Sequence, residues 1–391
     1  MTRATLLKLG LLTSLYFAQG LPFGFFTQAL PVLLREQGVS LTKIGLSSLL
    51  ALPWALKFLW APLVDRHGDR RRWILGLNAL GVALLCALAF FPPDLSLAPL
   101  LVAVALTNLV AATQDVAADG LAVDVLAPEE RGWGNGIQVA GYRAGMILGG
   151  GVILAAFPLL GWRLALWVLA VGLALTSVPV YLTREPPRAA PPQERSLLLA
   201  ALRRPGVPLW LLLLGGFKAG DALGAGMLRP YLVDRGLSLP EIGAMLGIVG
   251  FVAGLLGALA GGGGVSLLGR RRALLAFGLL QASGMAAWGV CAWLGEVVPI
   301  EALWAVCGYE HFAGGTATAA LFTVMMDSCE AEQAATDYTL QACAVVIATG
   351  AAASLGGALA DALGYPGLFL VATLGAVAGA FALVRAGRVQ G

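Results

Sequence analysis

The chain has 391 residues, of which 59% are hydrophobic and only 12% are charged, and its formal net charge is +3. A soluble domain carries roughly twice that share of charged residues, so the composition excludes an ordinary soluble protein and indicates an integral membrane protein. We read no nucleic-acid binding into the small positive charge, because the distribution of basic residues described below accounts for it.

Twelve apolar segments are long enough to cross about 30 Å of hydrocarbon as helices. They predict an all-α polytopic membrane protein with an N-terminal six-helix bundle at 1–183, a cytoplasmic linker at 184–206 and a C-terminal six-helix bundle at 207–391. The linker is rich in proline and poor in apolar residues. The predicted segments are 6–31, 43–63, 73–91, 98–122, 133–158, 163–183, 207–233, 241–262, 273–294, 299–325, 335–360 and 365–384.

Most Lys and Arg residues outside these segments fall at the two termini, in the linker and in the loops after even-numbered segments. Basic residues near membrane ends are retained on the cytoplasmic side. We therefore expect both termini to be cytoplasmic.

The second half repeats features of the first about two hundred residues later. Residues 17–24 return at 217–224, residues 38–45 return at 236–243, and Asp124 returns as Asp327. An internal repeat of this length in an apolar chain is typical of a transporter whose halves rock around a central site. We accordingly predict a pseudo-symmetric transporter with a site at the midplane between its halves. A glycine run at 261–264 favours close helix packing over nucleotide binding.

Charged side chains inside the segments are concentrated on a few helices. A charge near the bilayer centre costs at least about 2.5–3.5 kcal/mol, so each needs a partner, a watery cavity or a function. Asp115 and Asp119 share one helix face, so one of the two can hold a proton. The candidate proton-coupling residues are Asp115, Asp119, Asp221, Glu310 and His311.

A structural interpretation of the same residues stays open. Asp115 or Asp119 would then neutralise Arg143, Lys218 and Asp221 would neutralise each other along one helix, and His311 would form a polar pair with its neighbour. The cations among the remaining polar residues favour anionic groups such as carboxylates or phenolates. The candidate substrate-binding residues are Gln19, Gln28, Lys57, Gln138, Tyr142, Arg143, Lys218, Arg229 and Gln341. Nothing in the sequence has the spacing of a metal site or a catalytic triad, and we expect no cofactor.

The loop after the second segment places an acid at a helix end and a basic cluster beyond a glycine turn. We predict that Asp65 accepts hydrogen bonds from the neighbouring helix end and from Arg131, in the loop after the fourth segment, as a latch that locks one conformation; direct substrate contact is the alternative. The second-half copy has Ser266 in place of the acid, so its latch should be weaker. The candidate gating residues are Asp65, Arg66, Gly68, Arg70, Arg71, Asp124, Arg131 and Asp327.

Several of these motifs resemble known families. Residues 65–71 resemble the loop signature of the major facilitator superfamily, with Ala61 where its first glycine usually stands. In the second half, residues 325–327 and 336–341 resemble the siderophore permeases typified by RhtX and FptX, as do residues 16–22. Motifs at 20–23, 57–62, 114–115, 124–132 and 141–146 resemble the AmpG muropeptide permeases and their relatives, which include acetyl-CoA transporters.

The resemblance implies an importer of the bacterial inner membrane that is driven by the proton gradient, and we expect it to work as a monomer. AmpG-type permeases often have helices beyond twelve, whereas twelve segments are predicted here. Together with the second-half motifs, this difference favours a siderophore-like anionic cargo over peptidoglycan fragments. A muropeptide permease and an exporter of the same fold remain as alternatives. A polytopic membrane acyltransferase with His311 as base is the rival from another class, although a duplicated half offers an enzyme no evident gain.

Overall fold

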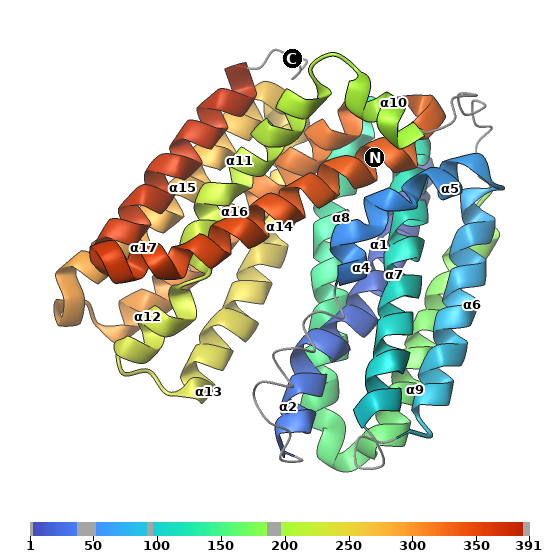
Figure 1. The fold of residues 1–391 in the computed structure, drawn as a ribbon, viewed down its shortest axis with the longest axis horizontal. Helices are drawn as coiled ribbons and strands as arrows, with labels where there is room; N and C mark the ends of the chain where they lie inside the picture. Colours follow the sequence, from blue (N-terminus) through green and yellow to red (C-terminus); the bar gives the residue numbers. More distant parts are fainter. Residues whose placement is uncertain (1–2, 37–51, 92–96, 186–196, 386–391) are drawn as a thin grey trace. The chain divides into compact units, whose positions relative to one another are not determined.

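The computed structural model describes residues 3–36, 52–91, 97–185 and 197–385, and every regular element in these ranges is helical. The chain forms two compact units, each described here by itself (Figure 1). Unit 1 comprises Met1–Ala127, Gly141–Leu198 and Cys329–Thr339. Unit 2 comprises Pro128–Ala140, Leu199–Ser328 and Leu340–Gly391. Each unit thus includes a short segment from the other half of the sequence.

Unit 1 is built from long apolar helices, blue to green in Figure 1. A helical run from α1 to α2 contains Pro22 and a π-helical turn, and the second predicted segment is broken into short pieces. Its first residues lie outside the described ranges. The elements are α1 (Arg3–Gly24), η1 (Phe25–Ala29), α2 (Leu30–Glu36), α4 (Leu52–Leu56), η3 (Lys57–Leu59), α5 (Ala61–Arg66), α6 (Arg70–Leu88), α7 (Leu97–Val125), the end of α8 (Arg131–Met146), η5 (Ile147–Val152) and α9 (Ile153–Leu182).

Unit 2 has the same kind of elements. The predicted linker contributes a short helix, α10, while residues 186–196 lie outside the described ranges. The elements are η4 (Pro128–Glu130), the start of α8, α10 (Leu197–Arg203), α11 (Val207–Ala225), α12 (Leu228–Asp234), α13 (Leu239–Ile242), η6 (Gly243–Val249), α14 (Gly250–Leu268), α15 (Arg270–Leu294), η7 (Gly295–Val297), α16 (Ile300–Asp327) and most of α17 (Ala334–Arg385). The turn η8 (Ala331–Gln333) and the first residues of α17, up to Thr339, belong to unit 1.

Among the described residues, eight helical stretches are long and apolar enough to cross a membrane. Two of them, Pro128–Leu182 and Ala331–Arg385, have 55 residues each and contain two predicted segments. Gly161 (φ 63°) and Gly364 (φ 67°) separate these segments, because only glycine adopts positive φ without a Cβ penalty. The other two predicted crossings are not among these eight stretches: segment 299–325 corresponds to α16, and segment 43–63 lies partly outside the described residues.

Glycines let the helices approach closely inside each unit. In unit 1, a Cβ on Gly20 of α1 would lie 2.9 Å from Gly145 Cα of α8. In unit 2, a Cβ on Gly261 of α14 would lie 2.6 Å from Thr316 Cα of α16, and one on Gly262 would lie 3.0 Å from Gly136 Cα of α8. The glycine run therefore serves helix packing, as predicted. The contact between α1 and α8 also fixes the side chains that surround the site described next.

Candidate functional site

A buried cluster of one cation, two carboxylates and one phenol lies in unit 1. Lys57 of η3 forms an ion pair with Asp115 of α7, and its Nζ lies 3.7 Å from Asp119 Oδ2. Tyr16 of α1 donates a hydrogen bond of 2.9 Å to Asp119 Oδ1. All four residues are at most 6% exposed. A single ammonium group therefore faces two carboxylates one helical turn apart, an arrangement that has room for one additional proton.

Lys57 contacts both acids, whereas the only partner expected for them from the sequence was Arg143. The reason is local. The second segment does not continue as one helix, because α5 begins around Pro62 and a 3-10 turn precedes it. That turn carries Lys57 and points its ammonium at α7. Arg143 is half-buried on α8 and also has interaction partners of its own.

Aromatic rings surround this cluster. The ring centroids of Phe23 and Trp54 are 5.3 Å apart, and those of Phe23 and Tyr142 are 5.8 Å apart. Lys57 Nζ lies 5.9 Å from the centroid of the Trp54 ring, within cation–π range. Tyr142 was a sequence candidate, but Phe23, Trp54 and Tyr16 were not. The sequence did offer a signal for two of them: Phe23 belongs to the motif at 20–23, and Trp54 lies just before Lys57.

The other candidates of the first half are dispersed. Gln19 is buried on α1, and Gln28 is half-buried on η1 beside Gly150. Gln138 is buried on the part of α8 that belongs to unit 2. Its repeat counterpart Gln341 accepts a hydrogen bond of 2.8 Å from Trp210 Nε1 and donates one of 3.1 Å to Met325 O. The Gln341 amide therefore ties α11, α16 and α17 together.

Unit 2 contains two further polar pairs. Lys218 Nζ lies 2.9 Å from Asp221 Oδ2 and 2.5 Å from Gln281 Oε1 of α15. His311 Nδ1 lies 2.6 Å from Glu310 Oε2. Both pairings were predicted, and Gln281 is an addition that sequence reasoning missed. Arg229 is exposed on α12.

A second buried network in unit 1 surrounds Arg70. Its guanidinium is fully buried, donates a hydrogen bond of 2.8 Å to Asp65 and forms an ion pair with Asp124. Asp65 also accepts hydrogen bonds from the Thr336 backbone N–H at 2.7 Å and from the Thr336 hydroxyl at 2.6 Å. Thr336 belongs to the first turn of α17, where backbone N–H groups have no intrahelical acceptor. Asp65 therefore caps a helix that comes from the other half of the sequence.

Arg131 lies in unit 2, and the predicted pairing with Asp65 is corrected. Arg131 donates a hydrogen bond of 2.7 Å to Asp327, which also accepts one of 3.0 Å from Arg270. Arg270 in turn donates to the Pro128 carbonyl. The first turn of α8 is packed here by Gly132 and Gly136, and this packing places Arg131 beside Asp327.

The remaining gating candidates shape the loop after α5. Arg66 is exposed, and Gly68 has a positive φ of 70° that makes the turn. Arg71 donates to the Tyr181 carbonyl, while its backbone N–H donates a hydrogen bond of 3.0 Å to Glu185. The loop is thereby fixed against the end of α9.

Comparisons with known proteins agree with this architecture. Residues 12–340 match the family model of the Major Facilitator Superfamily. The anhydromuropeptide permease of Escherichia coli (strain K12) is 30% identical over 389 residues, which cover 96% of this chain and 78% of that protein. The putative transporter AmpG 4 of Rickettsia felis is 25% identical over 93% of each chain. FucP in its outward conformation has a TM-score of 0.77 at 18% identity over 100% of both chains, and a human organic anion transporter, MFSD10, has a TM-score of 0.74 at 18% identity over 97% of this chain and 98% of that one.

The family match defines a multi-pass membrane transporter, and the all-α fold is the one that the solved neighbours share. The chain belongs to the major facilitator superfamily, in the group of the AmpG-type permeases.

Proposed function

We propose that the protein is a proton-coupled secondary transporter that imports a peptidoglycan fragment of the anhydromuropeptide type across the bacterial inner membrane. The observation that carries the proposal is the buried Lys57–Asp115–Asp119 cluster beside the rings of Phe23 and Trp54. The cargo class is supported by the E. coli anhydromuropeptide permease, which is similar over 96% of this chain.

The chemistry of the cluster suits such a cargo. Aromatic faces pack against the apolar faces of sugar rings, and an ammonium group attracts a carboxylate. A peptidoglycan fragment carries both groups. Phe23, Trp54 and Tyr142 supply the faces, and Lys57 supplies the cation.

Proton coupling follows from the count of charges. When a substrate carboxylate forms an ion pair with the Lys57 ammonium, the pairing of that ammonium with Asp115 and Asp119 is weakened. The two acids then lack a full counter-charge in a medium that penalises unpaired ions. Uptake of a proton by one carboxylate removes this penalty. Anion binding and proton binding therefore favour each other, which is the requirement for symport. Asp221 and the Glu310–His311 pair are the corresponding candidates in the second half.

The alternation itself is assigned to the predicted halves 1–183 and 207–391, joined by the linker 184–206. The contacts of Asp65 with α17 and of Arg131 with Asp327 each join residues from both halves, so they serve as gate contacts at the predicted cytoplasmic ends. They must break whenever these helix ends separate.

A siderophore-like cargo is the second candidate. It is supported by the motifs at residues 325–327 and 336–341, which lie in and around the gate contacts. The cluster in unit 1 suits phenolates or carboxylates equally well, so the cluster alone does not choose between the two cargoes.

Uptake by cells that lack their own permeases tests the proposal. We expect accumulation of a radiolabelled anhydromuropeptide that collapses with a protonophore, while a ferric siderophore is not accumulated. Lys57→Gln should weaken substrate binding, whereas Asp115→Asn or Asp119→Asn should abolish accumulation and preserve exchange. Asp69→Asn is the matched control, because Asp69 forms an exposed pair with Arg72. Siderophore accumulation with no muropeptide uptake would replace the cargo, and accumulation by every acid variant would refute proton coupling.

A further inference from the structure

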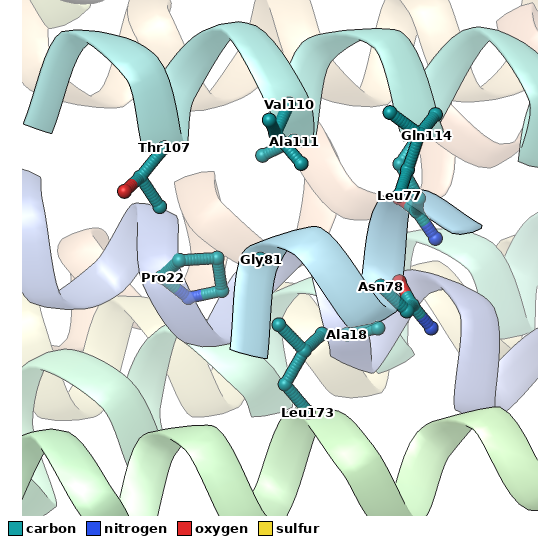
Figure 2. Close-up of a pocket in the computed structure, with 10 residues that line it drawn as sticks. All are labelled: Ala18, Pro22, Leu77, Asn78, Gly81, Thr107, Val110, Ala111, Gln114 and Leu173. Atoms are coloured by element: carbon teal, nitrogen blue, oxygen red, sulfur yellow. The ribbon is translucent and has the colours of Figure 1, made fainter. Parts of the chain in front are cut away.

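Two motifs of the sequence meet at a small cavity in unit 1. Pro22 precedes Phe23 in α1, and Gln114 precedes Asp115 in α7. Phe23 and Asp115 belong to the candidate site, whereas Pro22 and Gln114 line a cavity of about 20 Å³ between α1, α6, α7 and α9 (Figure 2). The cavity is therefore formed by the immediate chain neighbours of two site residues.

The cavity is bordered by polar groups whose hydrogen bonds are incomplete. Gln114 is 3% exposed, and its Nε2 has no acceptor among the described residues. Pro22 has no backbone N–H, so the carbonyl of Ala18 lacks its regular i+4 donor, and Ala18 also lines the cavity. A buried amide nitrogen without a partner costs about 1–3 kcal/mol, so such groups are normally satisfied by protein or water.

Asn78 of α6 completes the polar border. It is 3% exposed, and its Nδ2 donates a hydrogen bond of 3.0 Å to Ser177 Oγ, which leaves its carbonyl oxygen as an acceptor. Figure 2 shows the Gln114 side chain reaching from α7 toward α6, where Asn78 lies. Thr107 borders the other end, but its hydroxyl donates to Ala103 O within α7.

We propose that this cavity is a binding site for one water molecule that links α1 to α7. The water would accept a hydrogen bond from Gln114 Nε2 and donate to the carbonyls of Ala18 and Asn78. A cavity needs about 10–15 Å³ and two to four polar partners to hold a water; the volume of about 20 Å³ is sufficient, and Gln114, Asn78 and Ala18, which line the cavity, supply the three proposed partners. A bound cation does not fit, because one of the three partners is an N–H donor.

The linkage explains how α1 can continue through Pro22 although one of its helical hydrogen bonds is missing. The water replaces the missing helical hydrogen bond by one that crosses to α7, the helix that carries Asp115. By holding Pro22 and Gln114 together, the water also holds their chain neighbours Phe23 and Asp115 at a fixed distance. This inference does not depend on which solute the protein carries.

A double-mutant cycle in thermal unfolding tests the site. Gln114→Leu removes the donor, and Pro22→Ala restores an N–H for the Ala18 carbonyl, so both changes remove partners of the same water. We expect the fall in Tm caused by Gln114→Leu to be less than about half as large in the Pro22→Ala background as in the native protein. The matched control is Thr107→Val, which borders the same cavity and should not couple to Pro22.

An experimental density map at a resolution that shows ordered water is the direct measurement. We expect one peak within hydrogen-bonding distance of Gln114 Nε2 and Ala18 O, absent in the Gln114→Leu protein. Additive effects of Gln114→Leu and Pro22→Ala, or an empty cavity in the native map, would overturn the proposal.

Discussion

Two equivalent positions of the internal repeat have different chemistry. Asp65 in unit 1 is fully buried and holds the first turn of α17 through a charge. Its counterpart Ser266 in unit 2 lies against Gly132 in the first turn of α8, and its hydroxyl donates a hydrogen bond of 3.3 Å to its own helix at Gly262 O. The unit 1 contact is therefore electrostatic, whereas the unit 2 contact rests on close glycine packing and a partly exposed ion pair.

The contact thus lies at the same place in both copies of the repeat, but different forces stabilise it in each copy. Charge neutralisation should weaken the contact of Asp65 with α17 and leave the Ser266 side unchanged. A bulkier residue at Gly132 or Gly262 should weaken the contact on the Ser266 side and leave the contact of Asp65 with α17 unchanged. The two gate contacts can thus be perturbed separately.

The largest effect is expected for Arg70→Met. It leaves the buried Asp65 without its cation and removes the partner of Asp124, and breaking a buried ion pair in this way costs about 3–5 kcal/mol. Arg270→Met removes the partly exposed partner of Asp327 in unit 2 and should cost about 1 kcal/mol or less. Thermal unfolding in detergent measures both. Equal falls in Tm would show that the two networks are equivalent.

Asp65→Asn should have an intermediate effect. The amide oxygen still accepts from Thr336, but the charge at the first turn of α17 is lost, which weakens the contact by about 1–2 kcal/mol. We expect a shift toward states open on the predicted cytoplasmic side, measured by spin-label distances, while substrate affinity stays within about tenfold. A loss of affinity with unchanged distances would make Asp65 a substrate ligand.

Ser266→Asp should make the unit 2 contact resemble the unit 1 contact. An acid at this position would face the first turn of α8 as Asp65 faces that of α17, and should stabilise the contact by about 0.3–1 kcal/mol. Slower transport with unchanged affinity is the expected outcome. Ser266→Asn is the control, because Asn has nearly the same size as Asp but carries no charge. An equal slowing by Asn would show that the acid acts through volume.

The smallest effect is expected for Glu241→Gln. Glu241 lies before the apolar stretch Gly243–Leu268, although the predicted segment began with it. It accepts hydrogen bonds from the Ser238 backbone N–H at 2.8 Å and from the Ser238 hydroxyl at 2.6 Å, and these bonds lower the pKa of the exposed Glu241 carboxylate. Its stabilisation is present above the unfolded-state pKa and disappears as the pH falls through the lower folded-state pKa. The Tm difference from Glu241→Gln should therefore be slight at neutral pH and vanish in acid. A difference that grows in acid would contradict this sign.

Sequence patterns predicted the fold well because hydrophobic length and internal repetition are properties of whole segments. They also predicted pairs within one helix, such as Lys218 with Asp221, since helical spacing fixes them. Pairs between helices are harder to predict, because they depend on how each helix is rotated about its axis and on where a helix is interrupted. The 3-10 turn brought Lys57 to Asp115, a pair that the sequence did not indicate, and the packing of Gly132 directed Arg131 to Asp327 in place of Asp65.

The exchange of short segments between the units has a consequence for synthesis. Asp65 and Thr336 are separated by 271 residues. At about 5–20 residues per second, Asp65 leaves the ribosome roughly 14–54 s before the helix that donates hydrogen bonds to it is made. During that interval the predicted N-terminal bundle has been synthesised, but Cys329–Thr339, which completes unit 1, has not. Final assembly of unit 1 therefore waits for the last third of the chain, and truncations beyond the linker should yield an N-terminal bundle that is sensitive to proteases at the end of α5.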